Sequence, residues 1–266
     1  MEPVVETVAL PSFTTEVARR GKGPTLVLVQ GLGTDHRAWD PVVDHLEDHL
    51  SVVTFDNRGV GEASPVGEDT TIEDLADDVA DLIEHLDEGP VHVGGVSLGG
   101  GIAMRVASRH PRLVRSLALH STAARPDARL LAVLALRKEI LAQGVSGALL
   151  RPFVALWAWS RDGMALAKLP EGSTEIDQEH LDEYLQHLRV ATEQWMTDDE
   201  LAKITAPTLV TVGSADILTT PDHARDLHRG IPDSELVIVE DGGHAYYSES
   251  PGTFASLQLG WALRHD

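Results

Sequence analysis

Residues 91–101, VHVGGVSLGGG, contain the strongest structural signal in this chain of 266 residues. The stretch opens with a short β-branched run and ends in a helical pattern, with a G-x-S-x-G pentapeptide around Ser97 between them. Turning a strand into a helix over one or two residues strains the backbone of the central serine and requires small neighbours. The hydroxyl of Ser97 would then stand at the carboxyl end of a sheet and at a helix amino terminus, where the dipole favours negative charge. Ser97 is therefore the candidate nucleophile, and a structural serine in a glycine turn is the alternative.

Short apolar runs alternate with longer helical patterns on both sides of this stretch. An amphipathic pattern over residues 72–86 follows Thr71, a favourable N-cap with Asp74 three residues later, and predicts a helix. Besides Val91–Gly94, the expected strands cover residues 25–30, 51–55, 116–120, 207–212 and 235–239. This alternation predicts an α/β protein with a mostly parallel central sheet flanked by helices on both faces.

Two segments depart from the alternating pattern. The segment Val4–Val17 alternates in polarity and contains Pro11, which predicts a hairpin at the edge of the sheet. Residues 122–202 lose the strand signal and become rich in Leu and Ala, which predicts a helical cap inserted between two core segments, 1–121 and 203–266. This insert contains aromatic residues that would roof an apolar pocket or form the core of the cap itself: Phe153, Trp157, Trp159 and Trp195.

The charge of the chain limits its partners. Asp and Glu number 42 against 21 Lys and Arg, and the formal net charge is −21. Such a surface repels phosphate backbones and anionic lipids, so neither nucleic acid nor membrane is an expected partner. The absence of cysteine excludes disulfide frameworks, thiolate metal sites and a Cys nucleophile. The acidic amino-terminal residues resemble no signal peptide, so we expect a cytoplasmic protein.

A serine nucleophile needs an imidazole to take its proton. The chain has 13 histidines, and most of them lie in helical patterns where a solvated or capping role is expected. His244 differs because it follows the last expected strand in the loop Asp241-Gly242-Gly243-His244, which would open at the same sheet edge as Ser97. His120 ends a strand and is the rival candidate.

The imidazole in turn needs a carboxylate that fixes its tautomer. Asp216 lies a few residues after the strand that precedes the histidine strand, so it is the expected partner. Asp222 follows Pro221 near a helix start, where aspartate ordinarily serves as a cap. Asp241 is too close to His244 in sequence to reach its far nitrogen comfortably.

A tetrahedral intermediate also requires two hydrogen-bond donors for its oxyanion. One is expected from the backbone N–H of Leu98, the residue after the candidate nucleophile. The other is expected from Leu32 in the loop Gln30–Gly33, because glycines on both sides let the backbone turn an amide inward. A purely structural tight turn is the alternative for this loop.

Together these residues resemble the α/β-hydrolase superfamily over essentially the whole chain. The order Ser97, Asp216, His244 is the order of its catalytic triad. The other matching segments are Gln30–Gly33, Trp39–Pro41, Asp56–Gly61 with Ser64, Gly95–Gly99 and Gly243-His244. Within the superfamily the chain resembles 3-oxoadipate enol-lactonases and related bacterial esterases, on the segment Ser121–Arg125. Many relatives carry His where Gln30 stands, so we expect the oxyanion loop to be braced differently here.

The resemblance implies a serine hydrolase in which Ser97 attacks an ester or lactone carbonyl and water releases the acyl group. No metal or organic cofactor is expected, because the acyl-enzyme route supplies the difficult step. Trp39 and the cap aromatics Phe153, Trp157, Trp159 and Trp195 are the expected substrate contacts. The net charge disfavours polyanionic substrates, which favours an uncharged ester or lactone.

Three other functions remain compatible with the same residues. A polyketide thioesterase or cyclase would release the acyl group from Ser97 to an internal nucleophile. A ligand receptor could retain the triad without catalysis, and a cofactor-free haloperoxidase-like enzyme would use the same three side chains.

Overall fold

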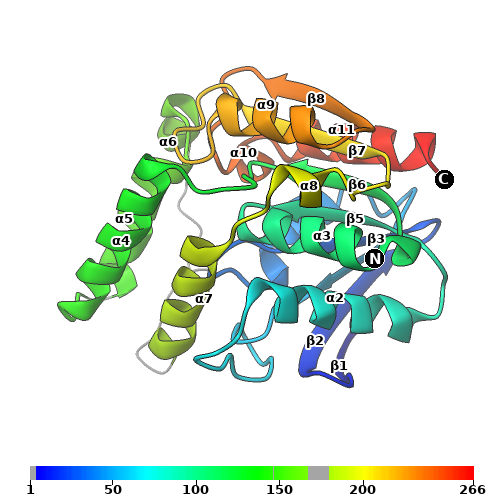
Figure 1. Ribbon diagram of the computed structural model, residues 1–266, viewed down its shortest axis with the longest axis horizontal. Helices are drawn as coiled ribbons and strands as arrows, with labels where there is room; N and C mark the ends of the chain where they lie inside the picture. Colours follow the sequence, from blue (N-terminus) through cyan, green and yellow to red (C-terminus); the bar gives the residue numbers. More distant parts are fainter. Residues whose placement is uncertain (1–3, 146, 167–179) are drawn as a thin grey trace.

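The computed structural model describes residues 4–145, 147–166 and 180–266 and shows a central sheet with helices on both faces (Figure 1). The eight strands lie in the order β1-β2-β4-β3-β5-β6-β7-β8. Their bounds are β1 Val4–Ala9, β2 Thr14–Gly21, β3 Thr25–Val29, β4 Ser51–Phe55, β5 Val91–Val96, β6 Val114–His120, β7 Thr208–Gly213 and β8 Ser234–Val239. The mostly parallel sheet predicted from the alternating pattern is confirmed.

The sheet is parallel from β4 through β8 and antiparallel at its amino-terminal edge. Every residue of β3, β4, β5 and β7 is buried, as expected for strands covered on both faces. The hairpin of β1 and β2 lies at one edge of the sheet, with Pro11 in its turn, but β2 also pairs with β4, so β1 is the edge strand of the pair. Because Pro11 lies between the two strands, its missing N–H removes no hydrogen bond from the sheet.

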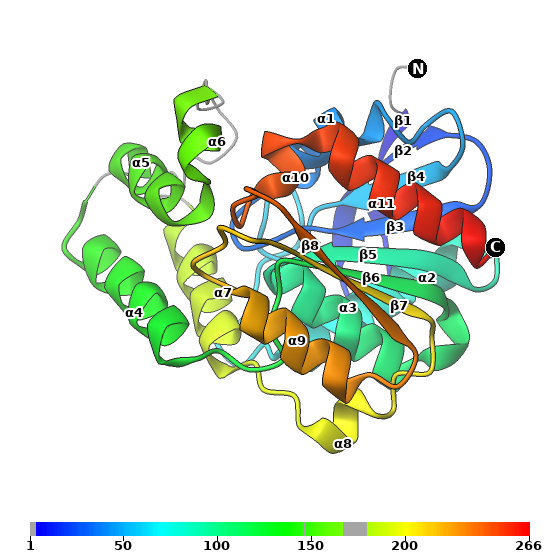
Figure 2. The same ribbon diagram turned by 90° about the horizontal axis from the view of Figure 1, so that it is seen from above.

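Helices cover the two faces of the sheet in separate layers (Figure 2). One layer contains α1 (Asp40–Val43), α10 (Tyr246–Glu249) and α11 (Pro251–Arg264); the other contains α2 (Ile72–Leu86), α3 (Leu98–Arg109), α8 (Asp198–Leu201) and α9 (Pro221–Gly230). The predicted capping box of α2 is present: Asp74 N donates to the Thr71 hydroxyl, and Thr71 N donates to the Asp74 carboxylate. Two 3-10 turns, His36–Trp39 and Pro111–Leu113, complete the core elements.

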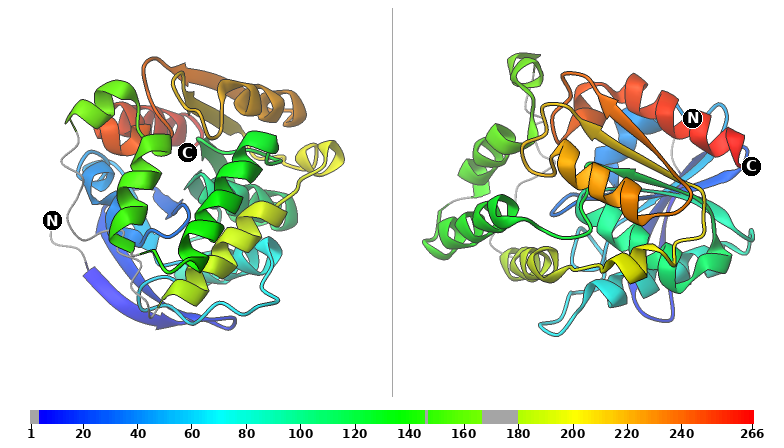
Figure 3. Two further views of the ribbon diagram at one scale, coloured as in Figure 1. Left: turned by 90° about the vertical axis from the view of Figure 1, so that its left-hand side faces the viewer. Right: turned by 45° about the horizontal axis from the view of Figure 1, so that its top comes forward.

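A further group of helices lies to one side of this core (Figures 1 and 3). It comprises α4 (Ala128–Ala142), α5 (Gly147–Ala158), α6 (Arg161–Leu166) and α7 (Leu181–Glu193). Residues of α4, α5 and α7 line a cavity together with the loops that follow β3, β5, β6 and β7. The helical group therefore faces the carboxyl ends of the parallel strands, where α/β sheets place their sites. In contrast, α8 packs on α3 and α9 although it falls within 122–202.

None of the helices in the described part of the chain combines the length and apolarity required to cross a bilayer.

Candidate active site

Ser97 is the single residue between β5 and α3. The strand ends at Val96, the helix begins at Leu98, and Ser97 has φ 55° and ψ −119°. A positive φ in a non-glycine residue is strained and persists only where the surrounding structure enforces it. The sharp strand-to-helix turn expected from the pentapeptide is therefore present, with Ser97 at its apex.

The glycines of the pentapeptide are required by close backbone approach. A Cβ on Gly95 would overlap the carbonyl group of Gly99, and a Cβ on Gly99 would overlap the carbonyl oxygens of Val29 and Gln30. The elbow thus packs directly on the end of β3, which brings the loop after β3 beside Ser97.

Hydrogen bonds hold the elbow at the carboxyl edge of the sheet. Ser97 N donates to the carbonyl of His120 at 3.0 Å, and the Thr122 hydroxyl donates to the carbonyl of Ser97 at 2.7 Å. Leu98 is the first residue of α3, so its amide has no acceptor within the helix. This free amide stands at the positive end of the helix dipole, next to the serine hydroxyl.

Asp216 and His244 meet across the loops that follow β7 and β8. His244 Nδ1 lies 2.9 Å from Asp216 Oδ2, and the Asp216 side chain is completely buried. Asp216 also accepts hydrogen bonds from Leu218 N at 2.8 Å, from Thr219 N at 2.9 Å and from the Thr219 hydroxyl at 2.8 Å. These donors leave the carboxylate few free lone pairs and fix its orientation toward the imidazole.

The surroundings of Asp216 favour its ionised form. Burial alone would raise the pKa of this carboxyl group, but the charge of His244 and the hydrogen bonds from His244, Thr219 and Leu218 outweigh it, and the pKa is lowered. The carboxylate is therefore charged at neutral pH and can stabilise an imidazolium.

The loop that carries His244 is tied to the end of α5. Ala245 N donates to the carbonyl of Ala158 at 2.7 Å, and Glu249 accepts hydrogen bonds from Ser160 N and from its hydroxyl, both at 2.7 Å. The position of the imidazole is thus coupled to the helical group outside the core.

The rival residues occupy other environments. His120 is fully buried beneath the elbow, where it contacts Thr211, Tyr246 and Gln258, and desolvation lowers its pKa to about 4. The carboxylate of Asp222 is 85% exposed and pairs with Arg225. Neither residue lines the cavity beside Ser97. His120 is a structural residue of the core.

A cavity of about 130 Å³ opens between the strand ends and the helical group. Ser97 and His244 both line it, and so do Leu32 and Leu98. Within the described residues no hydrogen bond joins the Ser97 hydroxyl to His244. Catalytic hydrogen bonds of ligand-free enzymes are often long and tighten when substrate binds. The volume suits a small acyl group.

The loop after β3, which is the candidate oxyanion loop, is braced by Gln30. Gln30 is completely buried, and its Oε1 accepts hydrogen bonds from Gly31 N at 2.9 Å and from the Thr34 hydroxyl at 3.0 Å. Its backbone carbonyl accepts a hydrogen bond from Asn57 Nδ2 at 3.1 Å. The glutamine therefore holds the turn that presents Leu32 to the cavity.

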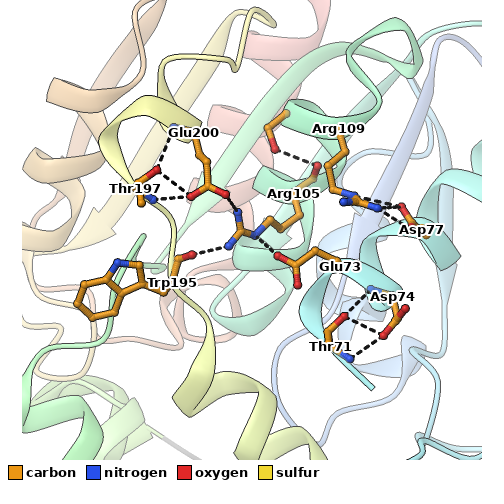
Figure 4. A network of polar contacts seen from close by, with 10 residues as sticks. Thr71, Glu73, Asp74, Asp77, Arg105, Arg109, Trp195, Thr197 and Glu200 are labelled. Carbon is orange, nitrogen blue, oxygen red and sulfur yellow. Dashed lines mark hydrogen bonds and ion pairs between the residues drawn. The ribbon is translucent and has the colours of Figure 1, made fainter. Parts of the chain in front are cut away.

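Two of the expected substrate contacts lie away from the cavity. Trp39 is completely buried against Tyr247 and Phe254, at ring distances of 5.2 and 5.4 Å, and does not itself line the cavity. Trp195 is 55% exposed, with the Arg125 guanidinium over its ring, while its carbonyl accepts a hydrogen bond from Arg105 (Figure 4). Neither tryptophan is among the residues that line the cavity, and their contact with substrate stays a prediction.

The aromatic residues in and just after α5 are also not among the residues that line the cavity. Phe153 and Trp157 are half-buried against the hydrophobic core, and the centres of their rings are 6.3 Å apart. Trp159, just after the helix, is half-buried as well. The α5 residues that line the cavity are Val154 and Ala158, which lie four positions apart on a neighbouring face of the helix. Helix α5 therefore supplies aliphatic side chains to this cavity, and the contact of its aromatic residues with substrate stays a prediction.

Sequence reasoning missed the lining supplied by α4. Leu130, Val133, Leu134 and Arg137 line the cavity at i, i+3, i+4 and i+7 spacing, which places them on one helix face. This spacing was available from the sequence, but it does not show which neighbour the face contacts.

One group in the described residues has donor atoms arranged as metal ligands. The ligand atoms of Glu16, His36 and Asp56 all lie within 4.8 Å of one another. Asp56 Oδ1 already accepts a hydrogen bond from His36 N and contacts His36 Nδ1, both at 2.8 Å. These contacts brace the chain after β4, outside the residues that line the cavity.

The sheet order and the serine elbow are those of an α/β hydrolase. Residues 24–251 match the model of the alpha/beta hydrolase fold family, and the chain belongs to that family. It is 28% identical over 257 residues to a protein of Agrobacterium fabrum whose name is that of a carbamate hydrolase, RutD. The match covers 92% of this chain and 95% of the relative. It is 28% identical to 3-oxoadipate enol-lactonase 1 of Acinetobacter baylyi, covering 90% of this chain and 88% of the relative. The enol-lactonase structure from Burkholderia xenovorans LB400 superposes with a TM-score of 0.85 at 26% identity, covering 96% of this chain and 99% of that one.

Proposed function

We propose that this protein is a cofactor-independent serine hydrolase that cleaves a small carboxylic ester or lactone through an acyl-enzyme. Ser97 attacks the carbonyl carbon, and His244 takes the hydroxyl proton through Nε2. The imidazolium then protonates the leaving alkoxide, and His244 activates the water that releases the acid.

Asp216 positions the imidazole in this mechanism. Its hydrogen bond with Nδ1 selects the tautomer whose Nε2 accepts a proton. Because the pKa of Asp216 is lowered, the carboxylate stays charged while the imidazolium forms. Electrostatic stabilisation of that cation lowers the barrier to proton transfer.

The amides of Leu32 and Leu98 are proposed as the oxyanion donors. Both residues line the cavity, and the close contact between Gly99 and the end of β3 holds the loop that carries Leu32 beside the start of α3, where Leu98 lies. Fixed amide dipoles of this kind commonly contribute about 3 kcal/mol each to the stabilisation of a tetrahedral intermediate.

Helices α4 to α7 are proposed to act as a cap over the acyl group, within the insert 122–202. The support is that α4, α5 and α7 supply aliphatic walls to the cavity that contains Ser97. Exclusion of water by such walls strengthens the interactions that stabilise charge in the site. The enol-lactonase relatives are consistent with an ester or lactone as substrate.

The observation that carries the proposal is the placement of a strained serine and an aspartate-bound histidine on one cavity. Intact-mass spectrometry after treatment with a fluorophosphonate tests it. The wild type should gain one adduct, Ser97→Ala should gain none, and Ser256→Ala, which removes an exposed serine of α11, should label like wild type. An unlabelled wild type, under conditions that fully label a standard serine esterase, would refute the mechanism.

A further inference from the structure

Arg137 is a cation in the wall of an otherwise mostly aliphatic cavity. It occupies the last position of the α4 face formed by Leu130, Val133 and Leu134, where an apolar residue would continue the pattern. Among the described residues no carboxylate pairs with it, and its buried Nε has no hydrogen-bond partner. An arginine that only covered surface would extend its head group to water.

The guanidinium is held near the oxyanion loop through Tyr184 of α7. The Arg137 guanidinium carbon lies 5.3 Å from the centre of the Tyr184 ring. The same ring packs so closely on Gly33 that a Cβ there would overlap it. Helices α4 and α7 lie side by side in this region (Figure 3). Arg137 is thus positioned on the side of the cavity next to the loop that carries Leu32.

The group stays charged in this setting. Desolvation lowers the pKa of Arg137 to about 10, which is still well above neutral pH. The aromatic face of Tyr184 stabilises a cation but leaves the guanidinium donors free for hydrogen bonds. A half-buried cation whose buried Nε has no partner favours an anionic partner far more strongly than a neutral one.

We infer that Arg137 binds a carboxylate on the acyl part of the substrate, so that the substrate class is a short hemiester, or a lactone that carries one acid group. This inference rests on the proposed function. A carboxylate matches the planar fork of a guanidinium in two hydrogen bonds. One unpaired cation balances one negative charge, whereas a phosphate monoester carries nearly two. The net charge of −21 acts on the whole surface, but the field inside a low-dielectric cavity is dominated by its nearest charge.

A matched pair of esters tests the inference on the wild type without any variant. Monomethyl glutarate carries a carboxylate, and methyl 5-amino-5-oxopentanoate has a neutral carboxamide of the same shape in its place. We expect kcat/KM to favour the carboxylate by about tenfold or more, mainly through KM, because the contact forms in the ground state. Equal turnover, or a preference for the carboxamide, would overturn the inference.

Variants then assign the preference to Arg137. Arg137→Met should lower the ratio of the two kcat/KM values by about tenfold or more, and Arg137→Lys should restore part of it. Arg129→Met removes the same charge from an exposed position of α4 and should leave the ratio at the wild-type value. A variant at Arg137 that lowers both activities equally would indicate a structural role and contradict the inference.

Binding to Ser97→Ala protein separates this inference from the proposed function. Calorimetric titration with the same two esters should show about tenfold tighter binding of the carboxylate, and this difference should disappear when Arg137→Met is added. Discrimination in binding without Ser97-dependent hydrolysis would refute only the hydrolase proposal. Ser97-dependent hydrolysis of both esters without discrimination would refute only the role of Arg137.

Discussion

Asp216 and His244 are 28 positions apart in the sequence, yet Oδ2 of the first lies 2.9 Å from Nδ1 of the second. The Thr219 hydroxyl completes a triangle with these groups, at 2.8 Å from Asp216 Oδ2 and 3.0 Å from His244 Nδ1. The turn that follows Asp216 therefore orients its carboxylate through contacts that do not involve His244. A carboxylate held in this way limits the imidazole to one tautomer and one orientation.

Replacing this carboxylate by its isosteric amide should preserve the fold and remove most of the activity. For Asp216→Asn we expect kcat to fall by roughly 10³- to 10⁴-fold, because the amide favours the wrong tautomer of His244 and no longer stabilises its cation. Kinetics on an activated ester such as p-nitrophenyl acetate measure the effect. Asp222→Asn, at an exposed aspartate nearby in the chain, is the control. Activity within a few-fold of wild type in Asp216→Asn would show that another group orients the imidazole.

Because His92 and His120 are buried, we expect the fold to lose stability on mild acidification. Desolvation lowers the pKa values of His92 and His120 from 6.5 to about 4, so both are neutral in the folded state. Below about pH 6.5 these two histidines bind protons in the unfolded chain, whereas in the folded chain they stay neutral until the pH approaches 4. Their contribution to the free energy of unfolding is therefore fully present above pH 6.5. It is lost as the pH falls toward 4, by at most about 3 kcal/mol for each histidine.

Urea unfolding at several pH values between 7 and 4 measures this decline. His92→Asn should make the decline shallower, because Asn does not titrate and can still reach the Ser116 hydroxyl that lies 2.8 Å from His92 Nδ1. His49→Asn, at an exposed histidine, controls for the substitution itself. An identical pH dependence for His92→Asn and wild type would show that His92 does not contribute.

Two glycine-to-alanine substitutions should have opposite effects on stability. Gly99→Ala places a Cβ on the backbone of β3 and should cost more than about 2 kcal/mol, because backbone cannot move aside cheaply. Gly260→Ala, in the helix α11 with open space around it, should stabilise the fold by about 0.5–1 kcal/mol. Thermal unfolding distinguishes them. A Gly99→Ala protein as stable as wild type would show that the elbow can be rearranged.

Removing the brace of the oxyanion loop should slow catalysis more than it weakens binding. Gln30→Leu leaves Gly31 N without its acceptor, so the loop should lose its fixed orientation. We expect kcat to fall by roughly tenfold with a smaller change in KM, because oxyanion contacts strengthen in the transition state. Gln143→Leu, at an exposed glutamine, is the control. A change confined to KM would indicate a role in substrate binding instead.

Much of the fold was predictable because its signals are local. The six parallel strands are short apolar runs, and each predicted run overlaps its observed strand within one or two residues. The elbow at Ser97 was predictable for the same reason, since its small residues are adjacent in the chain and a Cβ on Gly95 would overlap the carbonyl of Gly99 within the same pentapeptide. The alternation of strands and helices then places Ser97, Asp216 and His244 at one sheet edge.

The sequence by itself determined the sheet, the elbow and the loops from which the candidate triad comes, because steric limits and hydrophobic periodicity act between residues close in the chain. Only the tertiary structure decided what each side chain meets. An aromatic residue such as Trp39 is a reasonable candidate for a pocket, yet α11 covers it. A charged residue such as Arg137 is expected at the surface, yet it lines the cavity. The direction of a side chain depends on how distant helices pack, and the spacing of residues along one helix does not contain that information.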